Sequence, residues 1–145
     1  MDKPDKNIEE RLKNFVVPEV GVDVVDVERM RFALERTPRI RQRLFTDAEI
    51  AYCEKYRFAD RHFAGRWAAK EAVTKALGCG LIQWNGVEVF RKPRQAPTVR
   101  ISGKIKAFAD FVGVREEDLS ISITHSELSA AAVCIIRRGD RPKPE

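Results

Sequence analysis

Three places in the sequence put polar side chains where they interrupt apolar segments. Asp23 lies in the valine-rich stretch 20–27, where an unpaired buried carboxylate would cost several kcal/mol. Glu71 and Lys75 are four residues apart in an alanine-rich stretch, so they would share one face of a helix. His125 follows an alternating segment and is one of two histidines in the chain. Carboxylates, an amine and an imidazole are the groups of acid–base and metal-assisted phosphate chemistry.

Each of these positions also has an ordinary structural explanation. A strand aspartate can accept hydrogen bonds from backbone amides or pair with an arginine. Glu71 and Lys75 would form an i,i+4 pair contributing only about 0.2–0.5 kcal/mol on an exposed helix. A single histidine at a strand end is usually a polar cap. Taken one at a time, the three positions do not indicate a function.

The first half of the chain predicts one strand followed by helices. Residues 20–27 are nearly apolar on both faces, which is typical of a strand buried inside a sheet. Asp26 is placed to cap a short helix, and Thr46 and Glu49 form a capping box that starts another. The clearest helix begins at an Asp60 cap and stops before two closely spaced glycines. Its alanines form a smooth stripe that fits closely against a sheet: Ala64, Ala68, Ala72 and Ala76.

The second half predicts four strands and one helix. Residues 86–91 and 97–101 indicate two short strands joined by a basic, proline-containing turn, and Ser102 caps the following helix. The remaining strands are 119–124, which alternates strictly, and the apolar 130–136. Because strands and helices do not alternate regularly, the fold class is α+β, a mostly antiparallel sheet packed on the long alanine-lined helix.

Composition sets the limits of this single domain. The chain has 145 residues, and the organised domain spans 16–136 between a polar leader (1–15) and a charged tail (137–145). No apolar run approaches the roughly 18 residues of a membrane helix, and the N-terminus has no secretory apolar region. The three cysteines show no CxxC spacing, so we expect reduced, mostly buried thiols. A soluble, cytoplasmic protein without a membrane partner is expected.

Positive charge is concentrated between residues 29 and 43, which hold six arginines and one acid. Guanidinium groups suit phosphates, acidic helices and nucleic acid alike. A basic nucleic-acid-binding domain is therefore one hypothesis. It is disfavoured because the arginines are not interleaved with aromatics for base stacking, and because no zinc-finger or RNP-like motif is present.

Taken together, these residues form a recognisable pattern. The sequence G-V-D at 21–23 and W-A-A-K-E-A-V-T-K at 67–75 resemble the two signature motifs of the phosphopantetheinyl transferase superfamily. The resemblance covers about 20–136. Three stretches resemble its short, single-unit branch, the holo-[acyl-carrier-protein] synthases: GVDVVDVERM at 21–30, FAGRWAAKEAVTKALGCGL at 63–81 and SISITHSELSAAAV at 120–133.

The resemblance implies transfer of 4′-phosphopantetheine from coenzyme A to a serine hydroxyl of apo acyl carrier protein, leaving 3′,5′-ADP. It implies that Asp23 and Glu71 ligate Mg²⁺, which would neutralise charge on the pyrophosphate. Lys75 resembles the lysine at the reacting phosphate. Glu71 is the first choice for the base that activates the serine, and His125 the second.

The resemblance also assigns residues to coenzyme A. Arg66 and Lys70 would bind its phosphates. His125 matches a histidine near the metal and pyrophosphate, and we favour a phosphate or metal-bound-water contact over direct ligation, because Mg²⁺ prefers oxygen ligands. Whether the carrier serves fatty acid biosynthesis or polyketide synthesis stays open.

The arginine window acquires a partner in this interpretation, since acyl carrier proteins are acidic and helical. Arg29 is the strongest docking candidate and Arg36 and Arg39 are weaker, whereas Arg41 and Arg43 fit unrelated surface charge. Because the chain holds a single unrepeated unit, the resemblance implies a homotrimer with active sites at subunit interfaces. Asp23 and His125 would then face Glu71 and Lys75 across or near a subunit boundary.

Two stretches depart from the family pattern. The loop at 91–97 is basic and lacks a glycine common in the family, which changes its shape and any coenzyme A contact that it makes. Residues 128–129 lack a frequent aromatic. Neither departure removes a proposed catalytic residue. A member that binds coenzyme A or carrier protein without turnover is a third hypothesis, which the retained acids and lysine disfavour.

Overall fold

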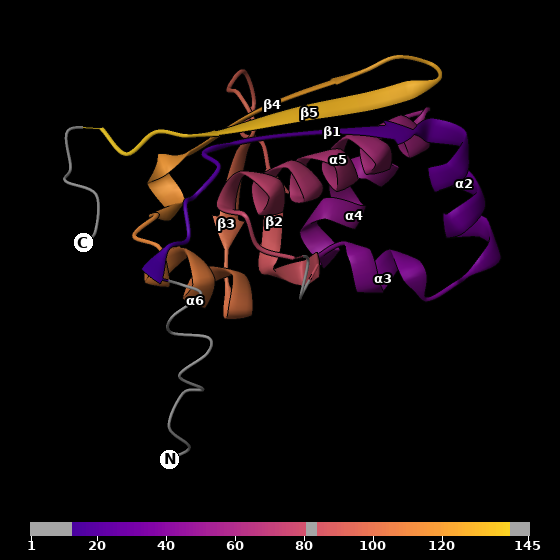
Figure 1. Cartoon of the computed structure of the whole chain (residues 1–145). Coiled ribbons are helices and arrows are strands. Elements are labelled where there is room, and N and C mark those ends of the chain that lie inside the picture. The colour runs from indigo at the N-terminus through magenta and orange to yellow at the C-terminus, as the bar shows by residue number, and fades with distance from the viewer. Residues whose placement is uncertain (1–12, 81–83, 140–145) are drawn as a thin grey trace.

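The computed structural model describes residues 13–80 and 84–139. A three-stranded antiparallel sheet with the order β1-β5-β4 lies on one side of the molecule, and the long helix α5 packs along its inner face (Figure 1). A separate antiparallel pair is formed by β2 and β3. The five strands are β1 (Val20–Asp26), β2 (Val87–Phe90), β3 (Thr98–Ile101), β4 (Leu119–His125) and β5 (Ser129–Ile136). The expected α+β class is confirmed.

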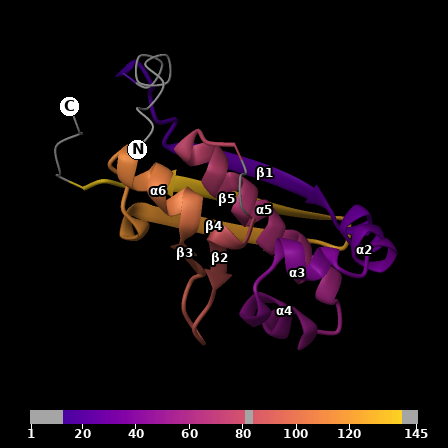
Figure 2. The same cartoon turned by 90° about the horizontal axis from the view of Figure 1, so that it is seen from below.

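The helices gather at two ends of this sheet–helix unit. Figure 2 shows α2, α3 and α4 grouped near one end of α5, with α6 and the β2–β3 pair toward the other. The helices are α2 (Val27–Arg36), α3 (Ile40–Leu44), α4 (Asp47–Glu54), α5 (Ala59–Leu77) and α6 (Gly103–Phe111), with short 3-10 turns η1 (Trp84–Gly86) and η2 (Glu116–Asp118).

Local capping signals place most helix starts correctly. Asp26 accepts a hydrogen bond from the Arg29 backbone N–H at 2.9 Å, and Thr46 with Glu49 forms the expected reciprocal capping box. The Asp60 cap is wrong. Helix α5 begins at Ala59, so Asp60 lies inside its first turn, where a carboxylate still complements the helix dipole.

Strand β1 differs from its expected burial on both faces. It is an edge strand of its sheet, and α5 covers only one of its faces. Val20, Val22 and Val24 on the opposite face are 58%, 60% and 67% exposed. An apolar run therefore indicated a strand correctly, but not what covers each face.

Close packing of α5 on the sheet depends on small residues. A Cβ added at Gly21 would lie 2.0 Å from the Ala72 carbonyl oxygen and 2.6 Å from the Ala76 nitrogen. One added at Gly65 would lie 3.0 Å from a methyl group of Ile123. The helix thus crosses from β4 near Gly65 to β1 near Ala72. The alanine stripe is fully buried: Ala64, Ala68, Ala72 and Ala76.

Residues just outside the expected domain limits of 16 and 136 also contact the domain. Phe15, placed in the polar leader, packs edge-on against Phe108 with ring centroids 5.8 Å apart. The Arg137 backbone N–H, placed in the tail, donates to the Asp118 carbonyl at 2.8 Å. The rest of the leader and tail, 1–12 and 140–145, lies outside the described residues.

Two further expectations concern cysteines and membranes. Cys53, Cys79 and Cys134 are all free thiols, and two of them are buried, as expected. Within the described ranges, no helix has the length and apolar character needed to cross a bilayer.

Candidate active site

Asp23, Glu71 and Lys75 come together on one flank of α5. The Lys75 ammonium donates to Asp23 Oδ1 at 3.0 Å and to the Val22 carbonyl at 3.2 Å. Solvent reaches this pair from the lysine side, since the Lys75 side chain is 52% exposed and that of Asp23 16% exposed. The buried strand carboxylate expected from the sequence therefore has its partner, the signature lysine.

Glu71, one helical turn before Lys75, completes this group. Its pKa is raised, first by burial and then by the negative charge of Asp23, while Lys75 acts in the opposite direction. The charge of Asp23 is thus near enough to Glu71 to act on it electrostatically. We call Asp23, Glu71 and Lys75 the carboxylate–lysine cluster.

The oxygen donors of this cluster suit a hard cation. Mg²⁺ is typically held by one or two carboxylates, with water and substrate phosphates completing its coordination. The parts of the chain that the structure describes contain no group of three or more His, Cys, Asp or Glu side chains able to hold a metal. Two carboxylates are within the number that a phosphate-binding Mg²⁺ uses, so the residues fit that ion.

Lys70 corrects one expectation. Its side chain is fully buried and pairs with Glu49 at 2.7 Å, and it also donates to the backbone carbonyls of Trp84 and Val87. With its ammonium group inside the protein and partnered there, Lys70 has no free donor for a coenzyme A phosphate. Its predicted role in phosphate binding is wrong for this structure.

The buried pair instead joins three elements. Glu49 on α4 accepts from Lys70 on α5, from the Thr46 backbone, and from the Val89 backbone N–H on β2 at 3.1 Å. Burial lowers the pKa of Lys70, while the Glu49 carboxylate raises it. Sequence analysis found Glu49 only as a capping residue and missed its partner, because Lys70 lies 21 positions away.

Arg66 precedes Lys70 by one turn and is only 5% exposed. Its guanidinium lies over the Tyr52 ring, 3.7 Å from the centroid. Its Nε is buried and has no hydrogen-bond partner among the described residues. An orphaned buried donor of this type is costly, and an anionic oxygen would satisfy it.

His125 does not join the carboxylate–lysine cluster within the chain. It ends β4, whereas Asp23 lies on β1. Because β5 lies between these two strands, their axes are roughly 10 Å apart across the sheet. Its exposed ring instead contacts His62 on α5 edge-on, with centroids 4.9 Å apart. Asp23 contacts Lys75 within one chain, whereas His125 of the same chain lies apart from both.

The arginines of α2 fall into two groups. Arg29 and Arg36 share the outward face of the helix with the exposed Phe32, and the Arg36 guanidinium lies 5.5 Å from the centroid of that ring. Arg31, also near Phe32, pairs with two glutamates of the same helix, Glu28 and Glu35. Arg39 is exposed at the start of α3.

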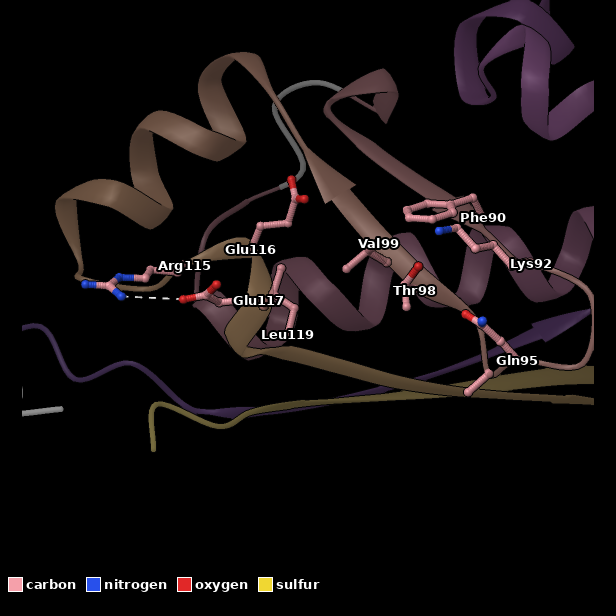
Figure 3. Close-up of a pocket in the computed structure, with 10 residues that line it drawn as sticks. Phe90, Lys92, Gln95, Thr98, Val99, Arg115, Glu116, Glu117 and Leu119 are labelled. Atoms are coloured by element: carbon pink, nitrogen blue, oxygen red, sulfur yellow. Dashed lines mark hydrogen bonds and ion pairs between the residues drawn. The ribbon is translucent and has the colours of Figure 1, made fainter. Parts of the chain in front are cut away.

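A separate cavity of about 580 Å³ lies between β3 and the start of β4 (Figure 3). The atypical loop contributes Lys92 and Gln95, and η2 contributes Glu116 and Glu117. Its charged groups are largely engaged, since Arg115 pairs with Glu117 at 3.4 Å and Glu116 accepts from the Ile101 backbone at 3.0 Å. The cavity does not include the carboxylate–lysine cluster.

Comparison with known proteins agrees with this architecture. Residues 19–129 match the model of the 4′-phosphopantetheinyl transferase superfamily. The chain belongs to this superfamily. A holo-[acyl-carrier-protein] synthase of Beutenbergia cavernae is 42% identical over 120 residues, 82% of this chain and 97% of that protein. The synthase of Thermoanaerobacter sp. strain X514 is 36% identical over 124 residues, 84% of this chain and 88% of its own length.

Solved structures show the same fold in this family. The Helicobacter pylori holo-[acyl-carrier-protein] synthase in complex with coenzyme A superposes with a TM-score of 0.69 at 27% identity, covering 81% of this chain and 98% of that one. The family assignment expected from the two motifs is thus confirmed.

Proposed function

We propose that this protein is a holo-[acyl-carrier-protein] synthase. It transfers 4′-phosphopantetheine from coenzyme A to a serine of apo acyl carrier protein. The observation that carries the proposal is the carboxylate–lysine cluster: the family's two motifs meet in space at a solvent-open group of two carboxylates and an ammonium. Relatives that cover most of the chain are synthases of this kind.

The reaction makes one phosphorus–oxygen bond and breaks another. The serine oxygen attacks the phosphorus nearer to pantetheine, 3′,5′-ADP leaves with the electron pair of the broken bond, and a base takes the serine proton. Glu71 is the first choice for this base and His125 the second. Lys75 is placed to stabilise the negative charge of the phosphates.

Asp23 and Glu71 would hold Mg²⁺, the ion that their oxygen donors fit. When bound, the ion neutralises charge on the pyrophosphate oxygens. In the same proposal, Arg66 contacts a phosphate of coenzyme A, supported by its orphaned Nε. Lys70 is not part of this contact.

We further propose that the protein is a homotrimer whose sites are completed between subunits. The outer face of the three-stranded sheet supports association, because Val20, Val22, Val24 and Ile135 leave a contiguous apolar surface exposed. His125 lies away from the carboxylate–lysine cluster of its own chain. A neighbouring subunit would therefore supply the histidine at each pyrophosphate.

The outward face of α2 is the proposed docking surface for the carrier protein. Arg29 and Arg36 present unpaired guanidinium groups among the described residues, with Phe32 between them, and Arg39 continues this positive surface. An acidic helix with apolar residues would be complementary in charge and polarity. A cytoplasmic location remains the prediction for such an enzyme.

Intact-mass spectrometry of an apo acyl carrier protein incubated with coenzyme A, Mg²⁺ and this protein tests the proposal. A gain of about 340 Da on the carrier, the mass of the transferred group, is expected with the native chain. Asp23→Ala and Glu71→Ala should abolish the gain, whereas Glu117→Ala, which removes an exposed carboxylate outside the cluster, should not. No gain with any of several carriers would favour a non-catalytic binder.

A further inference from the structure

His62 is the second histidine of the chain, and nothing in the family motifs assigns it a role. It lies in the first turns of α5 and has three ring contacts, the most distant being edge-on to Tyr52 with centroids 6.0 Å apart. Its imidazole stacks on Tyr56 with centroids 3.8 Å apart and planes 19° apart. On its other side it meets His125 edge-on at 4.9 Å, with planes 65° apart. His62 therefore lies between the Tyr56 ring and the ring of His125, the histidine proposed to contact the pyrophosphate.

Two further contacts connect the Tyr56 side chain to the protein interior. The Tyr56 hydroxyl donates to the Tyr52 hydroxyl at 3.1 Å, and the Tyr52 ring carries the Arg66 guanidinium. Arg66 is buried and Tyr52 is half-buried, so this end of the chain of contacts is fixed. The contacts from Arg66 through Tyr52 and Tyr56 therefore restrict the position of the His62 ring.

His125 has little else to orient it. Its backbone pairs with Ala130 at the end of the β4–β5 ladder, but its side chain is exposed. Within the described residues, no hydrogen bond or ion pair of the His125 side chain is present. An exposed imidazole at a strand end samples several rotamers unless a neighbour restricts it.

We propose that His62 is a positioning residue that holds the His125 ring, through its edge-on contact, in the orientation that meets the pyrophosphate. This inference rests on the role proposed for His125 in phosphopantetheine transfer. Burial, together with the nearby positive charge of His125 and Arg66, lowers the pKa of His62 to about 4. At neutral pH His62 is therefore an uncharged ring, as a packing role requires.

The expected effect is moderate and specific. Loss of an edge-on ring contact should lower the rate of carrier modification roughly 2- to 10-fold in His62→Ala. His62→Phe keeps a ring at this position and should recover most of that loss. Phe58→Ala is a matched control, because Phe58 is an exposed aromatic at the start of the same helix whose ring contacts Arg57 and Arg61.

A double-mutant cycle provides the test. In a His125→Ala background, His62→Ala should have no further effect on the rate, because the contact acts only through His125. If the rate losses of His62→Ala and His125→Ala multiplied in the double variant, the proposal would be contradicted. A His62→Phe protein as slow as His62→Ala would also contradict it.

A second readout does not depend on activity. The Cε1–H NMR signal of His125 should shift in His62→Ala, because the ring beside it has been removed, and an unchanged signal would overturn the contact. If the native protein modified no carrier, the proposed function would fail, while this spectrum would still decide whether His62 orients His125.

Discussion

The two flanks of α5 carry similar residues in opposite environments. Lys70 and Lys75, five residues apart, point about 140° apart around the helix axis. Lys70 pairs with Glu49 where neither side chain has any exposed surface, and Lys75 pairs with Asp23 in an open group. Both are lysine–carboxylate pairs within hydrogen-bond distance. Only the second has donors and acceptors left for a phosphate or a metal.

This contrast separates stabilisation from chemistry within a single motif. A buried ion pair with every donor satisfied joins elements, and its loss leaves an uncompensated charge inside the protein. An exposed pair contributes little stability, because water screens it, but it remains available to a ligand. Burial, rather than spacing in the motif, decides which lysine remains available to a ligand.

The largest effect on stability is expected from Lys70→Met. It leaves the Glu49 carboxylate buried without its cation, which should lower the free energy of unfolding by about 3–5 kcal/mol, measured by urea denaturation. A Lys70→Met/Glu49→Gln protein should regain part of the loss, since it buries no charge and its amide oxygen can still accept one of the two backbone N–H bonds, from Thr46 or from Val89. Unchanged stability in Lys70→Met would contradict the assigned role of the pair.

Lys75→Ala is expected to lower activity strongly and stability only slightly. The rate of carrier modification should fall by about 10²–10³-fold, because a charge that stabilises the reacting phosphates is removed. The melting temperature should change by only a few degrees, since the pair is exposed. Both quantities can be measured on the same preparation. Near-native activity in Lys75→Ala would show that the open flank is not the reacting one.

A smaller effect is expected on α2. Arg36→Gln should raise the KM for the carrier protein several-fold and weaken its salt dependence, with the KM for coenzyme A unchanged. Arg31→Gln removes the same charge from the same helix, but Arg31 is already paired with two glutamates. It serves as the matched control, and equal effects of the two variants would show that only net charge matters.

The smallest effect concerns pH. The pKa of His62 falls from 6.5 in the unfolded chain to about 4 in the folded one. Protons therefore bind the unfolded state better, and this contribution to stability is complete above pH 6.5 and is lost as the pH falls toward 4. His62→Phe should reduce the drop in urea midpoint between pH 7 and pH 5. An unaltered drop would mean that His62 does not contribute to it.

What the sequence could predict was mainly local. The Asp26 cap and the Thr46–Glu49 capping box depend on neighbours within three residues, so they could be found without the fold. The exposed face of β1 and the burial of Lys70 depend on which elements pack together, which a single sequence does not show. The motifs predicted that Asp23 belongs with Glu71 and Lys75, but not that one chain brings all three together, because that depends on how α5 packs on β1.

The central claim is that the carboxylate–lysine cluster of one subunit acts with His125 of another. Mixing Lys75→Ala chains with His125→Ala chains, by co-expression with two affinity tags, tests it directly. Each variant alone should be slow, and mixed trimers should recover up to about a quarter of native activity, because some interfaces then combine two intact halves. Mixed assemblies no more active than the two variants separately would contradict the shared site.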